Sequence, residues 1–237
     1  MRKLALSDEI LLKVDKAARY IGGEVNSVMK DKNEVEIRFA MCFLDVYEIG
    51  MSNLGMMILY NMFNQREDVW CERLFSPWPD LDKVMREKKI PLFALESQEP
   101  IRDFDFLGIT IGYEMCYTNI LQVLDLSGIP LKSADRGEDF PIVIGGGACA
   151  YNPEPLAPFF DMFYIGEGET VYDALFDAYK ANKKVGGSRR DFLLAAAKIP
   201  GIYVPSLYEV TYKEDGTIAS FAPTADGVPE KVQKQLI

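Results

Sequence analysis

Two kinds of segment alternate along most of this chain: short apolar runs typical of buried β-strands, and longer runs with the periodicity of helices. The first strand-like run, residues 35–44, becomes fully apolar toward its end, as an interior strand of a parallel sheet does. Strands are also expected at 70–75, 106–111, 141–144 and 160–165, and helices at 54–64, 78–88, 117–126 and 169–182. A short apolar run at 90–95 could add an edge strand. This order predicts an α/β fold with a doubly wound parallel sheet, Rossmann-like and of the flavodoxin type.

The two ends of the chain depart from this alternation. Residues 8–20 have helical spacing, with Ser7 placed to cap the helix. A helix at 191–199 and a hairpin over 203–221, turning at Asp215-Gly216, form a C-terminal appendage. We therefore expect a lead-in at 1–34, the Rossmann-like domain at 35–182, and an appendage with a linker at 183–237. The polar end of the chain resembles a linker toward a further domain.

The composition excludes several kinds of chemistry. The chain has no histidine, so it cannot hold a Ser-His-Asp triad, a histidine-ligated zinc or an imidazole ligand to a metal in a cofactor. Its net charge of −10 disfavours affinity for nucleic acid or for an anionic membrane. The four cysteines are widely spaced, which is typical of free thiols in the cytosol. No run is long enough to span a bilayer or to form a signal peptide, and we expect a cytoplasmic protein.

The loop after the first strand has the frame Asp45-x-Tyr47-x-x-Gly50, followed by Ser52 and Asn53 as helix caps. It resembles the Asp-x-His-x-x-Gly loop of cobalamin-binding domains, in which histidine ligates cobalt and the aspartate orients it. Here Tyr47 stands in place of that ligand, and a phenol is a poor neutral ligand. Taken alone, the loop fits an ordinary strand-to-helix turn with an acidic residue and a glycine better than a cobalt site.

Three later loops should meet the first one, because the carboxyl ends of parallel strands share one edge of the sheet. One contains Thr110, Gly112 and Tyr113. A second, residues 145–150, matches the Gly-x-Gly-x-x-Ala dinucleotide fingerprint, but Pro153 and Pro155 come before any helix could begin. The third is Gly166-Glu167-Gly168, whose carboxylate suits donors such as ribose or amide groups better than a phosphate, or simply serves the helix N-terminus.

Together these loops resemble the N-terminal region of a family of radical S-adenosylmethionine (radical SAM) proteins that have a cobalamin-binding-like domain. The resemblance covers the chain from about residue 20 onward. It rests on Tyr20-Ile-Gly-Gly23-Glu24-x-Asn26, Asp45 to Gly55, Ser76-Pro-Trp-Pro-Asp80, Pro91 to Ser97, Asp103-Phe-Asp105, Gly145 to Pro155 and Ile165-Gly-Glu-Gly-Glu169.

The resemblance implies that a radical SAM barrel follows this region in the longer protein. In that barrel a Cys-x-x-x-Cys-x-x-Cys motif, absent from this chain, holds a [4Fe–4S] cluster that cleaves S-adenosylmethionine. By this resemblance the chain is expected to stop before the barrel, to lack catalytic and metal-ligating residues of its own, and to have its own radical SAM domain as partner. The longer protein would be a radical SAM enzyme whose substrate the sequence does not reveal.

The leading hypothesis is therefore an accessory corrinoid-binding or corrinoid-derived domain that holds cobalamin without a histidine ligand. One alternative is a degenerate domain that binds no cofactor and shapes the substrate path or docks a partner. A further alternative is a flavin- or dinucleotide-binding module. The candidate cofactor-binding residues are Asp45, Tyr47, Glu48, Gly50, Ser52, Asn53, Thr110, Gly112, Tyr113, Gly145, Gly146, Gly147, Gly166, Glu167 and Gly168.

Overall fold

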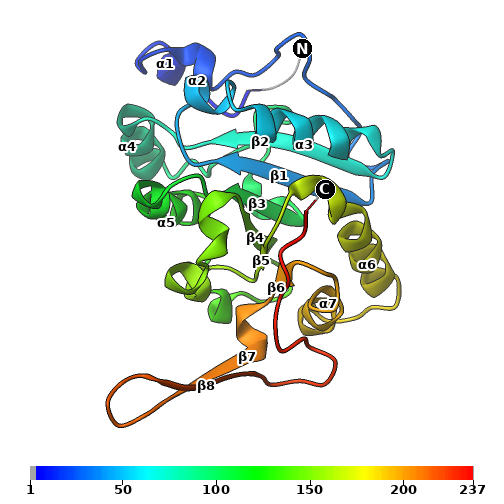
Figure 1. Ribbon diagram of the computed structural model, residues 1–237. Helices are drawn as coiled ribbons and strands as arrows, with labels where there is room; N and C mark the ends of the chain where they lie inside the picture. Colours follow the sequence, from blue (N-terminus) through cyan, green and yellow to red (C-terminus); the bar gives the residue numbers. More distant parts are fainter. Residues whose placement is uncertain (1–3, 237) are drawn as a thin grey trace.

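The computed structural model describes residues 4–236, and within them the core is one mixed sheet (Figure 1). Its six strands lie in the order β2-β1-β3-β4-β5-β6. The first five are mutually parallel and β6 runs antiparallel to β5. The strands are β1 (Ile37–Phe43), β2 (Val69–Phe75), β3 (Phe106–Thr110), β4 (Ile142–Gly146), β5 (Met162–Tyr164) and β6 (Ile202–Tyr203). The predicted doubly wound α/β fold is confirmed.

Helices cover both faces of the sheet (Figure 1). On one face pack α3 (Leu54–Gln65), α6 (Tyr172–Lys184) and α7 (Arg189–Ala196), in a core that includes Phe39 and Phe176. On the other pack α4 (Pro79–Lys88) and α5 (Tyr117–Leu126), in a core that includes Leu107 and Ile120. Because interior strands bury both faces, their side chains are apolar on each side, as the sequence pattern indicated.

Two buried ion pairs interrupt the apolar interior beside β2. Arg73 Nε lies 2.6 Å from Glu96 Oε1, and Arg38 Nη2 lies 2.6 Å from Glu72 Oε1. Both glutamates are fully buried. Burial disfavours the Arg73 cation, but Glu96 and Glu24 together hold its pKa above the ordinary value. The Arg73–Glu96 pair joins β2 to the segment at 96–99, and the Arg38–Glu72 pair joins β1 to β2.

Several predicted elements differ from the structure. Residues 8–20 form only α1 (Asp8–Leu11) and a 3₁₀ turn (Ala17–Arg19), since Lys16 between them is left-handed and the Asp15 N–H donates to Asp80. The Ser7 side chain makes no capping bond. The predicted edge strand at 90–95 is reduced to one bridge, Phe93 with Pro100.

The predicted hairpin is divided between two sheets. Its first residues form β6 in the main sheet, and a 3₁₀ turn (Pro205–Leu207) separates them from β7 (Tyr208–Tyr212). The hairpin proper pairs β7 with β8 (Ile218–Pro223) and projects away from the body (Figure 1). The chain then turns back, and Gln235 forms a short parallel bridge with Gly166. Among the described residues no helix is both long and apolar enough to cross a membrane.

Candidate functional site

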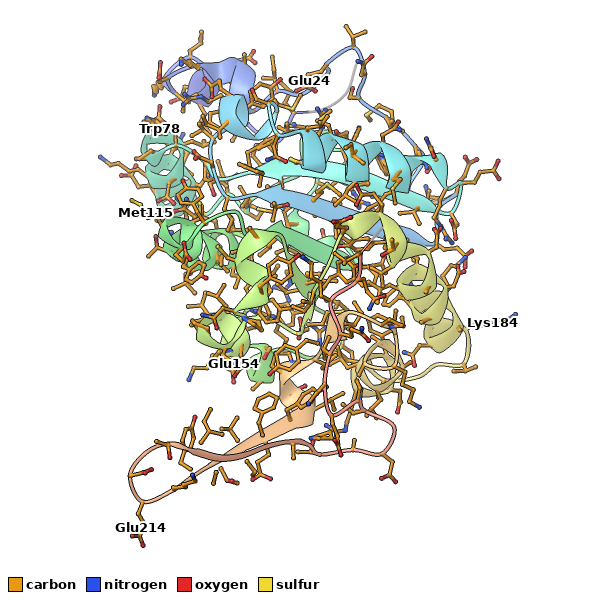
Figure 2. The ribbon with its side chains drawn as sticks, viewed as in Figure 1. Glu24, Trp78, Met115, Glu154, Lys184 and Glu214 are labelled. Atoms are coloured by element: carbon orange, nitrogen blue, oxygen red, sulfur yellow. The ribbon has the colours of Figure 1, made fainter. Side chains whose placement is uncertain are left out.

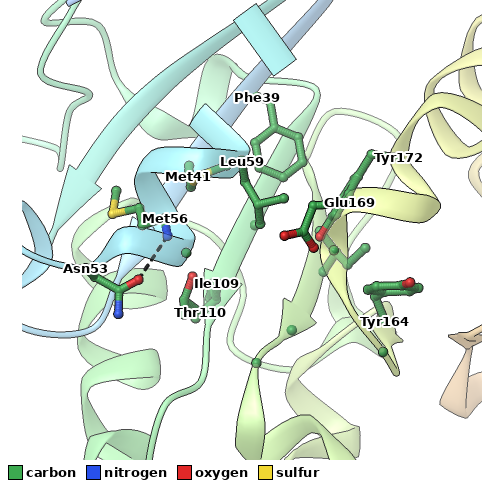
Figure 3. Close-up of a pocket in the computed structure, with 17 residues that line it drawn as sticks. Phe39, Met41, Asn53, Met56, Leu59, Ile109, Thr110, Tyr164, Glu169 and Tyr172 are labelled. Carbon is green, nitrogen blue, oxygen red and sulfur yellow. Dashed lines mark hydrogen bonds between the residues drawn. The ribbon is translucent and has the colours of Figure 1, made fainter. Parts of the chain in front are cut away.

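A cleft of about 190 Å³ opens at the carboxyl ends of the central strands (Figure 3). It lies over β1, β3 and β4 on the face covered by α3 and α6. The order of the strands reverses between β1 and β3, and ligands of doubly wound folds bind at such a switch point. The start of α3 forms one wall. The segment from Tyr164 to Tyr172, which leads into α6, forms the opposite wall. The site therefore lies where the fold itself favours a ligand.

The interior of the cleft is apolar, because strand residues of one face converge there. Phe39 and Met41 come from β1 and Ile144 comes from β4. Gly108 of β3 leaves room for the Phe39 ring, since a Cβ at Gly108 would lie only 2.3 Å from its Cζ. Gly146 is on the same face as Ile144, and a Cβ there would meet no atom within 4 Å. The cleft is thus open directly above Gly146.

Polar side chains lie only at the mouth of the cleft. Asn53 caps α3, with its Oδ1 accepting a bond of 2.9 Å from the Met56 N–H. Thr110 ends β3, and Glu169 comes from the opposite wall and points into the cleft (Figure 3). None of the described residues that line the cleft is a lysine or arginine. The site is suited to an uncharged planar group more than to a phosphate.

Two glycines in the loops around the cleft have backbone conformations that disfavour side chains. Gly147 has φ 101°, and its Cβ would lie 2.9 Å from the Ile111 carbonyl oxygen. Gly166 has φ 148°, and its Cβ would lie 2.5 Å from the Gln235 carbonyl oxygen. The Glu167 N–H donates to that same oxygen and the Gln235 N–H donates to Ile165, both at 3.1 Å. The C-terminal segment therefore holds one wall of the cleft in place.

The structure brings only some of the sequence-predicted residues to this cleft. Those that line it are Asn53, Thr110, Gly146, Gly147, Gly166 and Gly168. Asp45, Tyr47, Glu48, Gly50, Ser52, Gly112, Tyr113, Gly145 and Glu167 do not line it. Most of the loop at 45–53 therefore lies outside the cleft, and its side chains have other partners.

Tyr47 belongs to a hydrogen-bonded network beside β2. It is in the short helix α2 (Tyr47–Gly50), its ring packs on Phe75, and its hydroxyl donates to Glu24 Oε1 at 2.8 Å. The other oxygen of Glu24 lies 2.7 Å from Arg73 Nη2. Burial and the bond to Glu24 raise the pKa of Tyr47 to about 12, so the phenol stays protonated at neutral pH.

The remaining polar residues of this loop are also engaged. Arg19 Nε lies 2.9 Å from Glu48 Oε2 and holds the pKa of that carboxyl at about 2. Ser52 donates to the Glu48 carbonyl oxygen. The Tyr113 hydroxyl lies 3.4 Å from Asp45 Oδ2 at the edge of the sheet. Of these contacts, the Arg19–Glu48 pair attaches the loop to the N-terminal segment.

The remaining glycines have separate roles. Gly50 lies against Phe75, and Gly145 is buried against Phe163 on the face of β4 opposite the cleft. A Cβ at Gly112 would meet no atom within 4 Å. After β4 the chain forms 3₁₀ turns at Ala148–Tyr151 and Glu154–Phe159. Within residues 4–236, no α-helix begins directly after the glycine cluster, although a dinucleotide fingerprint needs one to meet the pyrophosphate.

Sequence reasoning did not select the apolar residues of the cleft or Glu169. Phe39 and Met41 occupy alternate positions of the first apolar run. That pattern indicated the buried face of a strand, but not a cleft next to that face. Glu169 follows Gly168 directly, and its place at the start of a helix suggested a capping role. The missed lining residues are Phe39, Met41, Gly55, Met56, Leu59, Gly108, Ile109, Ile144, Tyr164, Glu169 and Tyr172.

Comparison with known proteins identifies the family. No solved structure matches this chain significantly. The uncharacterized protein MJ0966 of Methanocaldococcus jannaschii is 32% identical over 85 residues, which is 35% of this chain and 18% of that protein. The chain thus matches less than a fifth of the length of this relative. Residues 55–205 match the family described as radical SAM proteins, N-terminal. Since this match covers more than half of the sequence, the chain belongs to the family of N-terminal regions of radical SAM proteins.

Proposed function

We propose that this chain is an accessory corrinoid-binding domain of a radical SAM enzyme. In this proposal the cleft takes the heterocyclic base at the end of the nucleotide tail of cobalamin. The corrin ring rests outside, over the carboxyl edge of the sheet, and no histidine ligates its cobalt. The observation that carries the proposal is the open, glycine-walled apolar cleft at the switch point.

The size of the cleft supports a site that takes the base of the cofactor and leaves the corrin ring outside. An apolar cavity of about 150 Å³ holds a benzene molecule, so about 190 Å³ with an open mouth suits one heterocyclic base. The much larger corrin ring does not fit inside. The missing side chain of Gly146 leaves space that a Cβ would fill, as expected where a flat group contacts the backbone.

The residues of the chain would bind and position the cofactor, without acting on it chemically. Phe39, Met41 and Ile144 would exclude water from the base. When bound, cobalamin supplies radical chemistry that protein side chains lack. A radical SAM domain, with its [4Fe–4S] cluster and S-adenosylmethionine, would act on a substrate at this same edge in the longer protein.

A second candidate function is a docking domain that binds no cofactor. The bonds of Tyr47 to Glu24 and of Glu48 to Arg19 favour it. These bonds attach the loop at 45–53 to the N-terminal segment. In cobalamin-binding domains the corresponding loop faces the corrin.

Retention of hydroxocobalamin distinguishes the two functions. The chain is mixed with hydroxocobalamin and passed through a desalting column, and the absorbance of the eluted protein is recorded. We expect the unaltered chain to retain the cofactor and Gly146→Val to lose it, because the added Cβ would meet no protein atom within 4 Å and the side chain would occupy the cleft. Gly137→Val is the matched control, because Gly137 is exposed, lies outside the cleft and also has no atom near its Cβ.

The corrinoid proposal is wrong if the unaltered chain elutes without colour. It is also wrong if Gly146→Val retains as much cofactor as Gly137→Val does. Colourless protein with an intact fold by circular dichroism would favour the docking function.

A further inference from the structure

One hydroxyl group at the cleft has no partner in the described part of the chain. Tyr172 begins α6 and lines the cleft, and Figure 3 shows its side chain beside that of Glu169. Among residues 4–236, no group forms a hydrogen bond with the Tyr172 hydroxyl. Tyr172 is only 8% exposed, yet its hydroxyl oxygen is not sealed from the cleft. A buried polar group normally has a partner, so this hydroxyl is available to a ligand.

Aromatic packing holds the Tyr172 ring in place. Its centroid lies 4.5 Å from that of Phe63 and 6.1 Å from that of Phe39. Burial raises the pKa of Tyr172 above the ordinary value, so the phenol keeps its proton and can donate it in a hydrogen bond. The neighbouring Tyr164 differs, because its hydroxyl already donates to the Glu167 carbonyl oxygen at 2.7 Å. Of these two phenols, only that of Tyr172 is free to recognise a ligand.

We propose that the Tyr172 hydroxyl donates a hydrogen bond to an unprotonated ring nitrogen of the base, so that the cleft prefers flat heterocycles that have such a nitrogen. This inference rests on the proposed function, because it names the polar contact by which the cleft would recognise the base of cobalamin. That base is a dimethylbenzimidazole, and one of its two nitrogens carries the ribose. The other nitrogen is an acceptor when it does not ligate cobalt, and it has no hydrogen to donate.

The shape of this base matches the distribution of polar groups in the cleft. Both nitrogens belong to the five-membered ring, and the ribose on one of them has to lead out of the cleft toward the corrin. The second nitrogen therefore also lies at the mouth, where Figure 3 shows the side chains of Glu169 and Tyr172. The six-membered ring with its methyl groups is apolar and would contact Phe39, Met41 and Ile144.

Desolvation makes the contact selective. A ring that enters the cleft displaces water from the Tyr172 hydroxyl. A ring with a nitrogen at that position replaces the lost water with a new hydrogen bond, whereas a ring with C–H there leaves the donor unpaired. Sites that hydrogen-bond a polar group of their ligand discriminate against analogues that lack this group.

Two probes of the same shape test the inference: an N-methylated dimethylbenzimidazole and the corresponding N-methylated dimethylindole. The N-methyl group takes the place of the ribose, and the probes differ only in one ring nitrogen that the indole replaces with C–H. Their affinities for the full chain are measured by NMR titration in mildly alkaline buffer, in which both are uncharged. We expect the benzimidazole to bind about three- to tenfold more tightly, as one hydrogen bond between uncharged groups predicts.

Tyr172→Phe removes the donor and keeps the ring. The ratio of the two affinities should fall to about one in this variant. The indole should bind at least as tightly as it does to the unaltered chain, because no hydroxyl is left unpaired, and this binding also shows that the cleft is intact. Equal affinities of the two probes for the unaltered chain would overturn the inference, as would an unchanged ratio in Tyr172→Phe.

Tyr179→Phe is the matched control on the same helix. The Tyr179 hydroxyl donates to Asp105 Oδ1 at 2.8 Å and lies outside the cleft. This variant also loses one phenol and its hydrogen bond, yet it should preserve the ratio of the unaltered chain. A ratio that falls equally in both variants would mean that the preference does not come from Tyr172.

The two proposals fail in different ways. If hydroxocobalamin is retained and the two probes bind equally, the recognition by Tyr172 is wrong and the corrinoid function stands. If the benzimidazole is preferred through Tyr172 and hydroxocobalamin is not retained, the corrinoid function is wrong and the recognition stands. If neither hydroxocobalamin nor the probes bind, both are wrong.

Discussion

At the scale of single residues, Gly50 shows how a candidate cofactor residue has a structural role. Its Cβ would lie 2.1 Å from Cε1 of the Phe75 ring, and its backbone is not left-handed, so the conflict is purely steric. We expect Gly50→Ala to lower the free energy of unfolding by about 1–3 kcal/mol, as overpacking a buried site does.

Urea denaturation measures this change, and Gly55→Ala is its control. A Cβ at Gly55 in the first turn of α3 would meet its nearest atom at an ordinary 3.5 Å. That substitution should stabilise the protein by up to about 1 kcal/mol, because alanine favours helices. Equal effects of the two substitutions would contradict the assigned role of Gly50.

Tyr47 gives a prediction that depends on pH. Removing its hydroxyl in Tyr47→Phe should cost about 1–2 kcal/mol of unfolding free energy at neutral pH, since the bond to Glu24 is lost. The folded pKa is about 12 and the unfolded pKa is near ~10. The contribution of the hydroxyl is therefore complete below pH ~10 and declines as the pH rises toward about 12.

Denaturation of both proteins at a series of pH values should show the stability gap narrowing over that alkaline range. Absorbance of ionised tyrosine should also show one fewer late-titrating group in Tyr47→Phe. A gap that stays constant up to pH ~12 would mean that the phenol does not depend on Glu24.

The sequence predicts the loops around the cleft better than it predicts what their residues do. Asn53 and the glycines at 146, 147, 166 and 168 were selected and do line the cleft. The partners of Tyr47 and Gly50, in contrast, come from segments about 25 residues away in sequence, at Glu24 and Phe75. No local pattern specifies such contacts, so the role of these two residues could be found only from the structure.

At the scale of elements, the central strands follow directly from the sequence because burial on both faces makes them apolar throughout. The predicted elements that differ from the structure lie outside the central strands. Residues 8–20 have a helical apolar pattern, yet they pack as two short pieces around the left-handed Lys16. The run 203–212 has strand character throughout, but Pro205 begins a turn that divides it between two sheets.

The C-terminal segment provides the prediction at this scale. Gln235→Pro deletes the N–H that donates to Ile165, so the bridge to Gly166 should open. We expect faster hydrogen exchange at the Glu167 amide and weaker retention of hydroxocobalamin, because Gly166 and Gly168 form part of the cleft wall.

Gln233→Pro is a suitable comparison for that experiment. Among the described residues, the Gln233 backbone N–H donates no backbone hydrogen bond. Exchange at Glu167 should therefore stay slow in this variant. Equal acceleration in both variants would show that the segment supports the wall by some contact other than this bridge.

At the scale of the whole molecule, large apolar side chains are exposed at the edge of the sheet that holds the cleft. They lie in loops that follow different strands: Leu54 after β1, Met115 after β3 and Tyr151 after β4. Figure 2 shows Met115 on the opposite side of the molecule from Lys184, which ends α6. Such groups are typical of surfaces that a partner covers, and the proposed partner is the radical SAM domain.

Oxidation of methionine by hydrogen peroxide tests this partner, because sulfoxide formation depends on access to sulfur. Met115 is 85% exposed and Met29 is 53% exposed. Met29 serves as an internal control at the opposite edge of the sheet, because the neighbouring Lys30 bonds the carbonyl oxygen of Val69, where β2 begins.

A stable interface covers roughly 800 Å² of each partner, enough to bury Met115 and its neighbours. In a longer protein that includes the radical SAM domain, Met115 should oxidise several-fold more slowly than in this chain alone, while Met29 oxidises at the same rate. Unchanged oxidation of Met115 would mean that the radical SAM domain covers another part of the surface. The radical chemistry would then not take place beside the cleft.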